Sequence, residues 1–405
     1  MKNKTRLLII GITMNCAGTE KSFLSFLSAL DFTRFDVTLL LAKREGLLLD
    51  QLPPEVKVTV MEKYGDMFLL SGKNAVRTLT SCFVKENPLT LFEIFPCFLK
   101  TLFTKGEKRA SAATKMWLHF MKKMPCVNEE YDVAVAYWGD RTMFYMCDKV
   151  KAKKKITWLH FDYANPPRDE GIYLPYFKKC DKIVTVSHAV DEALRAKLPE
   201  IADKTVMMEN IISPSQIREL SALGDTFADA DFSGKRILTV GRIIDQKGID
   251  LIPPVLKKLR EDGFDVRWYI LGDGDDEYKE SVKKQLAELG VSDMLVFLGA
   301  TENPYRYVAD CDIYAQPSRH EGKPIAVEEA KILCKPILAS HYLSAPEQLE
   351  GGTLGVICDI NSEAIYEGIK TLLSDEDLCA TLKEALASRD FSNRAEIEKF
   401  YEMIQ

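Results

Sequence analysis

The chain has 405 residues, 46% of them hydrophobic and 28% charged, which is typical of a globular protein with room for two or three domains. No apolar run reaches the roughly 18–20 residues of a spanning helix, and the basic start leads into a short strand rather than a secretion signal, so we expect a cytoplasmic protein. Ten Cys without a Cys-x-x-Cys pair, and only five His, argue against a disulfide framework and a metal site.

The first half of the chain alternates apolar runs with segments compatible with helices. The runs are Leu7 to Ile10, Val37 to Leu41, Val56 to Val60, Tyr131 to Tyr137, Lys155 to Trp158 and Lys182 to Val186. Such alternation is typical of parallel strands covered by helices. Gly18 lies in a loop of small residues after the first run. Because ligands gather at the C-terminal ends of parallel strands, Gly18 is placed for close approach to a phosphate.

The segment from 67 to 124 differs from its surroundings. It is rich in Phe, Leu, Met and Lys and shows no clear strands, and between Asp66 and Lys123 it holds ten Lys and Arg against four acids. The whole first half is basic, with 32 Lys and Arg against 25 Asp and Glu in residues 1–212, whereas residues 213–405 hold 22 against 35. Interleaved apolar and basic groups on helices favour contact with an anionic membrane surface. Ordinary amphipathic helices that pack on the sheet are an equally good reading.

A histidine follows one of the strands of the first half. His160 stands just beyond the run Lys155 to Trp158, where binding and catalytic groups collect in open α/β sheets. Asp162 is a weaker candidate beside it. A lone His is more often structural, so its position alone does not establish a function. Further along, Ser187 is the expected N-cap of a helix from Ala189 to Leu198.

The second half opens, after a polar connection, with the strand Arg236 to Val240. Gly241 and Arg242 follow this strand directly, and Lys247 comes five residues later. A guanidinium binds a diphosphate through two parallel hydrogen bonds, and an ammonium adds a point charge. This motif therefore predicts a site that stabilises a negatively charged leaving group without a metal ion.

A second glycine-rich turn follows the strand Trp268 to Leu271. It contains Gly272 and Gly274 and opens a helix, and it resembles the loop that lines the nucleotide pocket in the enzyme family named below. Asp273 and Asp275 have the spacing of a metal-binding Asp-x-Asp pair. We favour turn and helix-start roles for them, because acids at a helix N-terminus are favourable without a metal.

The stretch Pro317 to Ala330 is expected to be a loop that enters a helix, with Pro324 in its first turn. The backbone N–H groups near Lys323, Pro324 and Ile325 would then face a negatively charged ligand. Glu321 and Glu329 bracket this anion site, eight residues apart. Such spacing suits a sugar nucleotide, which is charged in the middle and polyhydroxylated at both ends.

These motifs resemble retaining glycosyltransferase family 4, which has the two-domain GT-B fold, and within it the capsule and exopolysaccharide enzymes of bacteria. The family pattern is a Glu, seven residues and a second Glu, matched here by Glu321 and Glu329, with the Gly-Arg…Lys-Gly motif matched at Gly241 to Gly248. The usual Phe-Gly-Leu-Pro segment is replaced by Lys323 to Ala326. In the first half the resemblance is limited to a few positions: Gly18, Glu20, His160 and Ser187.

The resemblance implies two doubly wound Rossmann-like domains that face each other across a cleft. We expect the acceptor domain in residues 1–208, the donor domain in residues 213–388 and a final helix, within 391–405, that packs back on the first domain. In the family the first Glu contacts the transferred sugar and the second holds the ribose, which assigns Glu321 and Glu329. His160 would orient the sugar or the acceptor hydroxyl.

The implied reaction moves a sugar from a nucleotide diphosphate sugar, with UDP favoured, to a glycan or a lipid-linked acceptor in surface polysaccharide synthesis. The expected catalytic residues are His160, Glu321, Arg242 and Lys247. No cofactor, metal or nucleic acid is expected, and segment 67–124 places the protein at the inner face of the membrane if it binds lipid. A nucleotide-sugar epimerase of the same fold and a noncatalytic glycosyltransferase partner are the alternatives. A dinucleotide oxidoreductase is disfavoured because the chain lacks the Gly-x-Gly-x-x-Gly fingerprint.

Overall fold

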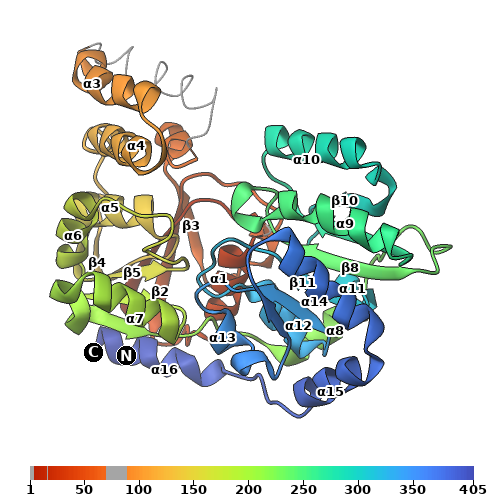
Figure 1. The fold of residues 1–405 in the computed structure, drawn as a ribbon. Coiled ribbons are helices and arrows are strands. Elements are labelled where there is room, and N and C mark those ends of the chain that lie inside the picture. The colour runs from red at the N-terminus through yellow and green to blue at the C-terminus, as the bar shows by residue number, and fades with distance from the viewer. Residues whose placement is uncertain (1–3, 16, 70–88) are drawn as a thin grey trace. The chain divides into compact units, whose positions relative to one another are not determined.

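A computed structural model describes residues 4–15, 17–69 and 89–405. The chain forms two compact units, each built on one parallel sheet (Figure 1). Unit 1 consists of Met1–Asn15, Phe23–Glu209 and Ala395–Gln405. Unit 2 consists of Cys16–Ser22 and Asn210–Arg394. The chain therefore returns to unit 1 for its last segment.

Unit 1 has a seven-stranded parallel sheet with the order β3-β2-β1-β4-β5-β6-β7. Its strands are β1 (Thr5–Gly11), β2 (Phe35–Leu41), β3 (Lys57–Val60), β4 (Glu130–Ala136), β5 (Lys151–Leu159), β6 (Lys182–Thr185) and β7 (Thr205–Met207). Its helices are α1 (Gly18–Ala29, which begins in unit 2), α3 (Thr90–Phe103), α4 (Gly106–Met121), α5 (Asp140–Lys149), α6 (Glu170–Lys179), α7 (His188–Lys197) and α16 (Ile397–Ile404). The strand order reverses between β1 and β4, as in a doubly wound fold.

Helices cover the sheet of unit 1, so its central strands are apolar throughout. The side chains from Leu7 to Ile10 in β1 are at most 1% exposed. A parallel strand buried on both faces cannot alternate apolar and polar residues, which explains the continuous apolar run. Aromatic residues fill the space between the sheet and α16, where Phe400 lies 5.0 Å from Phe26 between ring centroids.

Unit 2 has a six-stranded parallel sheet with the order β10-β9-β8-β11-β12-β13. The strands are β8 (Lys235–Val240), β9 (Val266–Leu271), β10 (Leu295–Gly299), β11 (Ile313–Gln316), β12 (Ile337–Ser340) and β13 (Val356–Cys358). The α-helices are α8 (Pro214–Ser221), α9 (Ile252–Glu261), α10 (Asp276–Leu289), α11 (Tyr305–Asp310), α12 (Ile325–Ile332), α13 (Ala345–Gln348), α14 (Ser362–Ser374) and α15 (Glu376–Ala387). The strand order reverses between β8 and β11, and ligands of doubly wound sheets bind at such a switch point.

Side-chain caps begin several helices. Ser187 Oγ accepts a hydrogen bond from the Val190 N–H at the start of α7, which confirms the predicted N-cap. Asp275 caps α10 in the same way through the Tyr278 N–H. A capping oxygen satisfies one of the four N–H groups that a helix start leaves without a partner.

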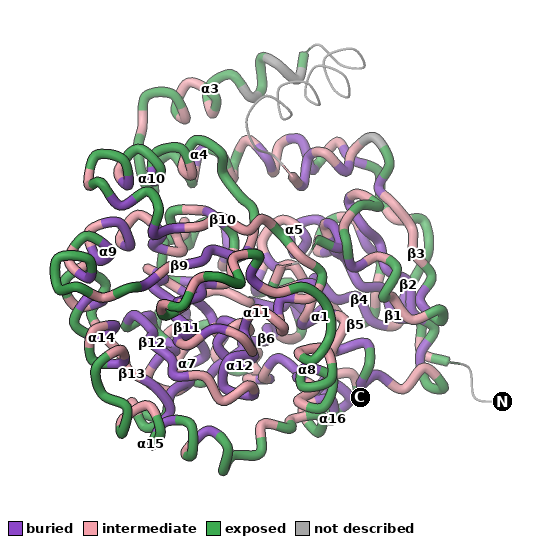
Figure 2. The backbone as a smooth tube through the Cα atoms, turned by 90° about the vertical axis from the view of Figure 1, so that its right-hand side faces the viewer, coloured by how far each residue is buried: buried purple, intermediate pink, exposed green. Residues whose placement is uncertain are grey.

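The helices α3 and α4 pack against each other on the outside of unit 1 (Figure 1). Figure 2 shows that most of the described residues of α3 are exposed, whereas the residues of the sheet strands are mostly buried. The predicted membrane segment 67–124 includes both helices, and its residues 70–88 lie outside the described part of the chain. Among the described residues, no helix combines the length and apolar character that crossing a membrane requires.

Candidate functional site

Two loops of unit 2 meet at the switch point of its sheet. One follows β8 and runs from Gly241 to Gly248, and the other follows β11 and runs from Pro317 to Pro324. The Arg319 N–H donates to the Gln246 carbonyl oxygen at 2.8 Å, which ties the loops together. The residues predicted to carry the donor chemistry in the second half therefore lie on adjoining segments.

Glu321 and Lys247 form an ion pair between these loops. Lys247 Nζ donates to Glu321 Oε1 at 2.6 Å, and the two side chains are 13% and 7% exposed, respectively. Two residues absent from the prediction complete the site, since Ser318 Oγ lies 2.6 Å and Gln316 Nε2 lies 3.2 Å from the same oxygen. Three donors thus hold Oε1 of Glu321 in place, and Gln246 Nε2 lies 3.4 Å from its Oε2. A lysine ammonium has three protons, so Lys247 keeps capacity for a further anion.

Arg319 supports the loop that carries Glu321. Its guanidinium donates to both carboxylate oxygens of Asp250, at 2.8 and 2.6 Å, and Tyr278 also donates to Asp250. Burial opposes the ionisation of Asp250, but the bonds from Arg319 and Tyr278 outweigh it and hold the pKa of this carboxyl below its usual value. The bidentate pair therefore joins the Glu321 loop to the segment that follows Lys247.

Gly248 allows the two loops to approach closely. Its φ of +65° lies in the left-handed region, and an added Cβ would stand 2.1 Å from the Pro317 carbonyl oxygen. Gly272 has a similar role in the next loop, with φ +144° and an added Cβ at 2.2 Å from the Gly241 carbonyl oxygen. Only glycine fits such contacts without displacing backbone.

The glycine-rich turn after β9 adjoins the loop that follows β8. Ile243 N–H donates to the Asp273 carbonyl oxygen at 3.0 Å, and an added Cβ at Gly274 would meet the Ile243 carbonyl oxygen at 2.3 Å. The Asp273 carboxylate accepts from the Ala300 N–H, and Asp275 caps α10. Both acids have the turn and helix-start roles that the sequence predicted for them.

Arg242 extends from the same place without a partner of its own. The residue is exposed, and its guanidinium forms no hydrogen bond or ion pair with any described residue. It follows β8 directly, at the switch point of the sheet. A charged, unpaired guanidinium in this position is available to an anionic ligand.

The two consecutive acids of α12 point in different directions, as their helical spacing predicts. Glu329 is 1% exposed, and its Oε1 accepts from Lys21 Nζ at 2.9 Å, where Lys21 belongs to the segment Cys16–Ser22 of unit 2. The other oxygen of Glu329 is buried and has no hydrogen-bond partner among the described residues. Glu328 instead contacts Gln348 and Lys331, both at 2.9 Å. Residues one apart on a helix differ by about 100°, which explains the separation.

The start of α12 differs slightly from the prediction. Helix geometry begins at Ile325, and Pro324 is the extended residue before it, with ψ 120°. Its carbonyl oxygen accepts from Gln348 Nε2 at 2.9 Å, which fixes the entry of the helix. The first N–H groups of α12 have no partner within the helix, as at any helix start. Lys323 is half-buried just ahead of them.

Two predicted residues lie in other segments. His160 follows β5 in unit 1, and its ring lies 6.4 Å from the Trp158 ring and 4.8 Å from the Tyr137 ring between centroids. Gly18 begins α1, and an added Cβ there would meet no atom within 4 Å, so packing does not require glycine. Neither geometry contradicts a ligand role, and both roles remain predictions.

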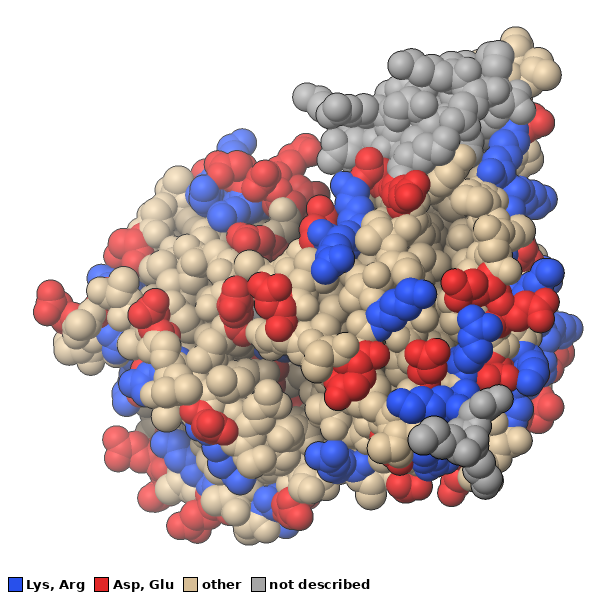
Figure 3. All heavy atoms as spheres, turned by 180° about the vertical axis from the view of Figure 1, so that it is seen from behind, with Lys and Arg blue, Asp and Glu red and all other residues tan. Residues whose placement is uncertain are grey.

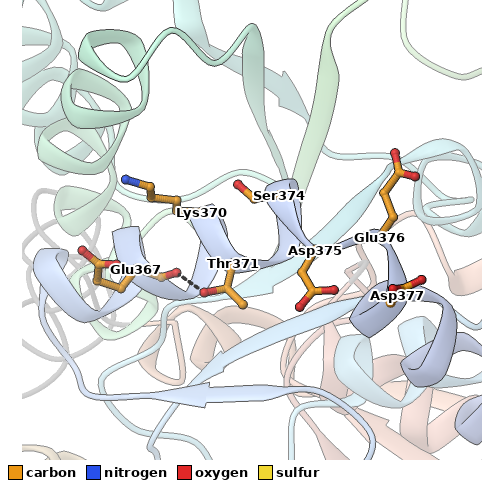
Figure 4. A pocket seen from close by; sticks show the side chains of 7 residues that line it. All are labelled: Glu367, Lys370, Thr371, Ser374, Asp375, Glu376 and Asp377. Carbon is orange, nitrogen blue, oxygen red and sulfur yellow. Dashed lines mark hydrogen bonds between the residues drawn. The ribbon is translucent and has the colours of Figure 1, made fainter.

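An open pocket elsewhere in unit 2 lies along α14 and the start of α15 (Figure 4). Its lining residues are Glu367, Lys370, Thr371, Ser374, Asp375, Glu376 and Asp377. Asp375 caps α15 through the Leu378 N–H, and Lys370 pairs with Asp262 at 2.6 Å. None of the predicted donor-site residues lines this pocket, and two of its charged groups, Lys370 and Asp375, already have structural partners.

The second half of the chain is similar to known glycosyltransferases. Residues 229–389 match the family model "Glycosyl transferases group 1". An uncharacterized glycosyltransferase of Haemophilus influenzae is 29% identical over 255 residues, which cover 61% of this chain and 68% of that protein. A second relative is the N-acetylgalactosamine-N,N'-diacetylbacillosaminyl-diphospho-undecaprenol 4-alpha-N-acetylgalactosaminyltransferase of Campylobacter jejuni, 28% identical over 163 residues. That match covers 40% of this chain and 43% of the relative, so the chain spans less than half of it.

Solved structures resemble the whole chain in fold. HepE from Anabaena, in complex with UDP-glucose, superposes with a TM-score of 0.70 at 15% identity and covers 99% of both chains. WaaG, a glycosyltransferase involved in lipopolysaccharide biosynthesis, gives a TM-score of 0.62 at 12% identity over 98% of this chain and 99% of its own. With two Rossmann-like parallel sheets, the predicted α/β GT-B fold is confirmed. The matches together support a glycosyltransferase: the chain carries a group 1 glycosyl transferase domain in residues 229–389 on a GT-B fold.

Proposed function

We propose that the protein is a retaining glycosyltransferase of the hexosyl type. It transfers a sugar from a UDP-sugar to a glycan or lipid-linked acceptor in surface polysaccharide synthesis, without a metal ion. The observation that carries the proposal is the Lys247–Glu321 pair at 2.6 Å at the switch point of the unit 2 sheet, within the matched domain. A donor site there needs cations for the diphosphate and carboxylates for the hydroxyls at its two ends.

The residues of unit 2 suit the departure of a nucleoside diphosphate. When the bond between the anomeric carbon and the phosphate oxygen breaks, its electron pair stays with the diphosphate, whose negative charge increases. Arg242, which has no partner among the described residues, and Lys247 would stabilise that charge. The acceptor oxygen bonds to the anomeric carbon on the same face, and its proton passes to the departing diphosphate oxygen. Glu321, held by three donors, would bind sugar hydroxyls, and we assign it no covalent role.

Glu329 supports binding of the ribose. One carboxylate oxygen is occupied by Lys21, whereas the other is buried without a partner among the described residues. A buried acceptor without a hydrogen bond is costly, and a ribose hydroxyl would supply the donor. His160 in unit 1 would orient the sugar or the acceptor hydroxyl, and Gly18, Gly241, Gly272 and Gly274 would let backbone approach the nucleotide.

Named relatives bear on the acceptor and on the nucleotide. The Campylobacter relative is named for a diphospho-undecaprenol-linked acceptor, and a Mycolicibacterium smegmatis relative, 28% identical over 179 residues, for GDP-mannose and phosphatidylinositol monomannoside. Both names favour a lipid-linked acceptor. Because one relative is named for GDP, the donor nucleotide must be determined directly.

The test is a calorimetric binding screen of the full chain with UDP-, GDP- and ADP-sugars. We expect a UDP-sugar to bind best and Arg242→Ala and Glu329→Ala to weaken it about tenfold to a hundredfold, since each removes a charged hydrogen-bonding group. Arg260→Ala and Glu384→Ala are matched controls, because both residues are exposed and outside the site. Unchanged binding in the two site variants would refute the assignment.

Turnover then tests the finer claims. Product analysis by NMR should show the anomeric configuration of the donor, and activity should persist in excess EDTA. Product formation without any acceptor would favour an epimerase instead. Binding without turnover in the presence of glycan and lipid-linked acceptors would favour a noncatalytic partner.

A further inference from the structure

Helix α3 exposes an unusually apolar surface to solvent. The exposed fractions are 79% for Phe92, 55% for Phe95, 61% for Leu102 and 82% for Phe103. At about 100° per residue, these four side chains fall within an arc of about 100° on the helix. Leu89 and Phe98, which are 66% and 45% exposed, widen the same face. Continuous apolar patches on a soluble protein mark interaction surfaces.

The one acidic side chain of α3, Glu93, is 46% exposed and is paired with its own fold. Glu93, the acid of this helix, accepts a hydrogen bond from Lys123 Nζ at 2.6 Å, just beyond the end of α4. On the helical wheel, Glu93 lies outside the arc that contains Phe92 and Phe95. An ordinary amphipathic helix would turn these faces the other way, with the apolar arc against α4. The orientation of α3 therefore presents its apolar arc to the surroundings, where an apolar environment would stabilise it.

Cations gather where α3 turns into α4. Lys100, Lys105, Lys108 and Arg109 are all exposed, and none forms an ion pair with a described residue. Glu107 is the one acid between positions 100 and 109. Phe103 and Leu102, two strongly exposed apolar residues, adjoin these cations. Elsewhere, on the face drawn in Figure 3, basic and acidic side chains intermingle.

We propose that α3 lies in the surface of an anionic lipid bilayer, with its apolar arc among the acyl chains and the cations of the α3–α4 turn at the headgroups. The apolar arc and the adjoining cations have the arrangement of an interfacial helix. In such a helix, aromatic and aliphatic side chains enter the bilayer, and neighbouring Lys and Arg contact anionic lipids. The four cations favour a lipid surface over a second copy of the chain as the partner of α3. Two copies joined through α3 would bring the same four cations together, and these would repel each other. The inference does not depend on the donor chemistry.

The test is flotation of the full chain with lipid vesicles. We expect co-flotation with phosphatidylcholine vesicles that contain about 30% phosphatidylglycerol, and much less with phosphatidylcholine alone. Because each cation near the surface contributes about fivefold, Lys105→Glu/Lys108→Glu/Arg109→Glu should weaken binding more than tenfold. Raising NaCl from about 0.05 M to about 0.5 M should weaken it as well. Phe92→Ser/Phe95→Ser/Phe103→Ser should abolish flotation with both vesicles.

Matched triple variants outside α3 test whether any loss of exposed apolar surface or of positive charge reduces flotation. Leu47, Leu223 and Ile360 are 46%, 54% and 38% exposed outside α3, so their triple change to Ser should leave flotation intact. Lys57, Lys178 and Lys383 are also exposed and lie outside the α3–α4 turn. Their triple change to Glu is the control for the charge-reversal variant and should leave flotation intact. Circular dichroism verifies that each variant is folded.

Two results would overturn the proposal. One is a wild-type chain that fails to float with the anionic vesicles, or an α3 serine variant that floats as well as its control. The other is self-association of the wild-type chain, measured by sedimentation velocity, that the α3 serine variant loses while neither protein binds vesicles. That second result would assign the apolar arc to a second copy. Since flotation needs no donor, failure here leaves the proposed reaction untouched.

Discussion

At the residue scale, the ion pair between Lys247 and Glu321 links stability to the proposed function. Both side chains are largely buried, at 13% and 7% exposure. Removing one member leaves the other charge buried without compensation, which costs about 3 to 5 kcal/mol. We therefore expect Lys247→Met to lower the local unfolding free energy around β8 and β11 by about 3 kcal/mol, as measured by hydrogen exchange. The double variant Lys247→Met/Glu321→Gln should recover part of the loss, and strictly additive effects would contradict a coupled pair.

Asp250 and Arg319 give unit 2 a defined response to acid. The pKa of Asp250 lies below its ordinary 3.8 because bonds from Arg319 and Tyr278 outweigh the cost of burial. The ionised Asp250 therefore contributes its full stabilisation at pH values above its pKa in the unfolded chain. That stabilisation is lost as the pH falls through its lower pKa in the folded protein. Arg319→Met should raise the pKa of the partly buried Asp250 instead. We expect this variant to be destabilised most at neutral pH and to approach the wild type in acid, in unfolding titrations against pH.

Sequence motifs predicted a chemistry for these residues but not all of their contacts. Arg242, Lys247, Glu321 and Glu329 were recognisable because fixed spacings place them after strands or at a helix start. The pairing of Lys247 with Glu321 depends on how two loops meet that are about seventy residues apart in the chain, and local sequence patterns do not encode that meeting. Gln316 and Ser318 could have been suspected, since they stand at the end of β11 beside Glu321. Nothing in the sequence signalled Lys21 as the partner of Glu329.

At the element scale, Gly248 controls the approach of two loops. Gly263 is a matched control, because it also has a positive φ, of +80°, but an added Cβ there would meet no atom within 4 Å. Gly263→Ala should lower the free energy of unfolding by about 1 kcal/mol, because alanine is disfavoured in the left-handed backbone region. Gly248→Ala should cost more and also weaken donor binding, because its Cβ would meet the Pro317 carbonyl oxygen at 2.1 Å. Calorimetry of both variants checks this, and equal effects would show that the close approach is unimportant.

The elements found from the sequence are those with strong apolar patterns. The central strands of both sheets were located because burial on two faces demands consecutive apolar residues. Strand β5 begins at Lys151, four residues before the predicted start, because its first residues are largely Lys at a solvated strand end. The strands β7 and β13 were missed, since each has only three residues. Helix α8 lies in the expected polar connection, where it has a single buried side chain, Ile217.

At the scale of the whole molecule, α16 completes the core of unit 1. Phe400 is fully buried and contacts Phe26, Phe35 and Trp158. Phe400→Ala should destabilise unit 1 by about 3 to 5 kcal/mol through the cavity that it leaves. The exposed Glu402 on the same helix gives a control, Glu402→Ala, that should change little. Hydrogen exchange should show the loss in the unit 1 sheet, and a loss confined to unit 2 would contradict this assignment.

The return of the chain to unit 1 also sets an order of events during translation. All of unit 2, through Arg394, is synthesised before Phe400 and Tyr401 exist. Domains usually fold as the ribosome releases them, the N-terminal one first. Here the nascent unit 1 must wait, with the apolar surface around Phe26 and Phe35 uncovered, until α16 emerges. The unit that begins the chain is therefore completed only after α16 has been synthesised.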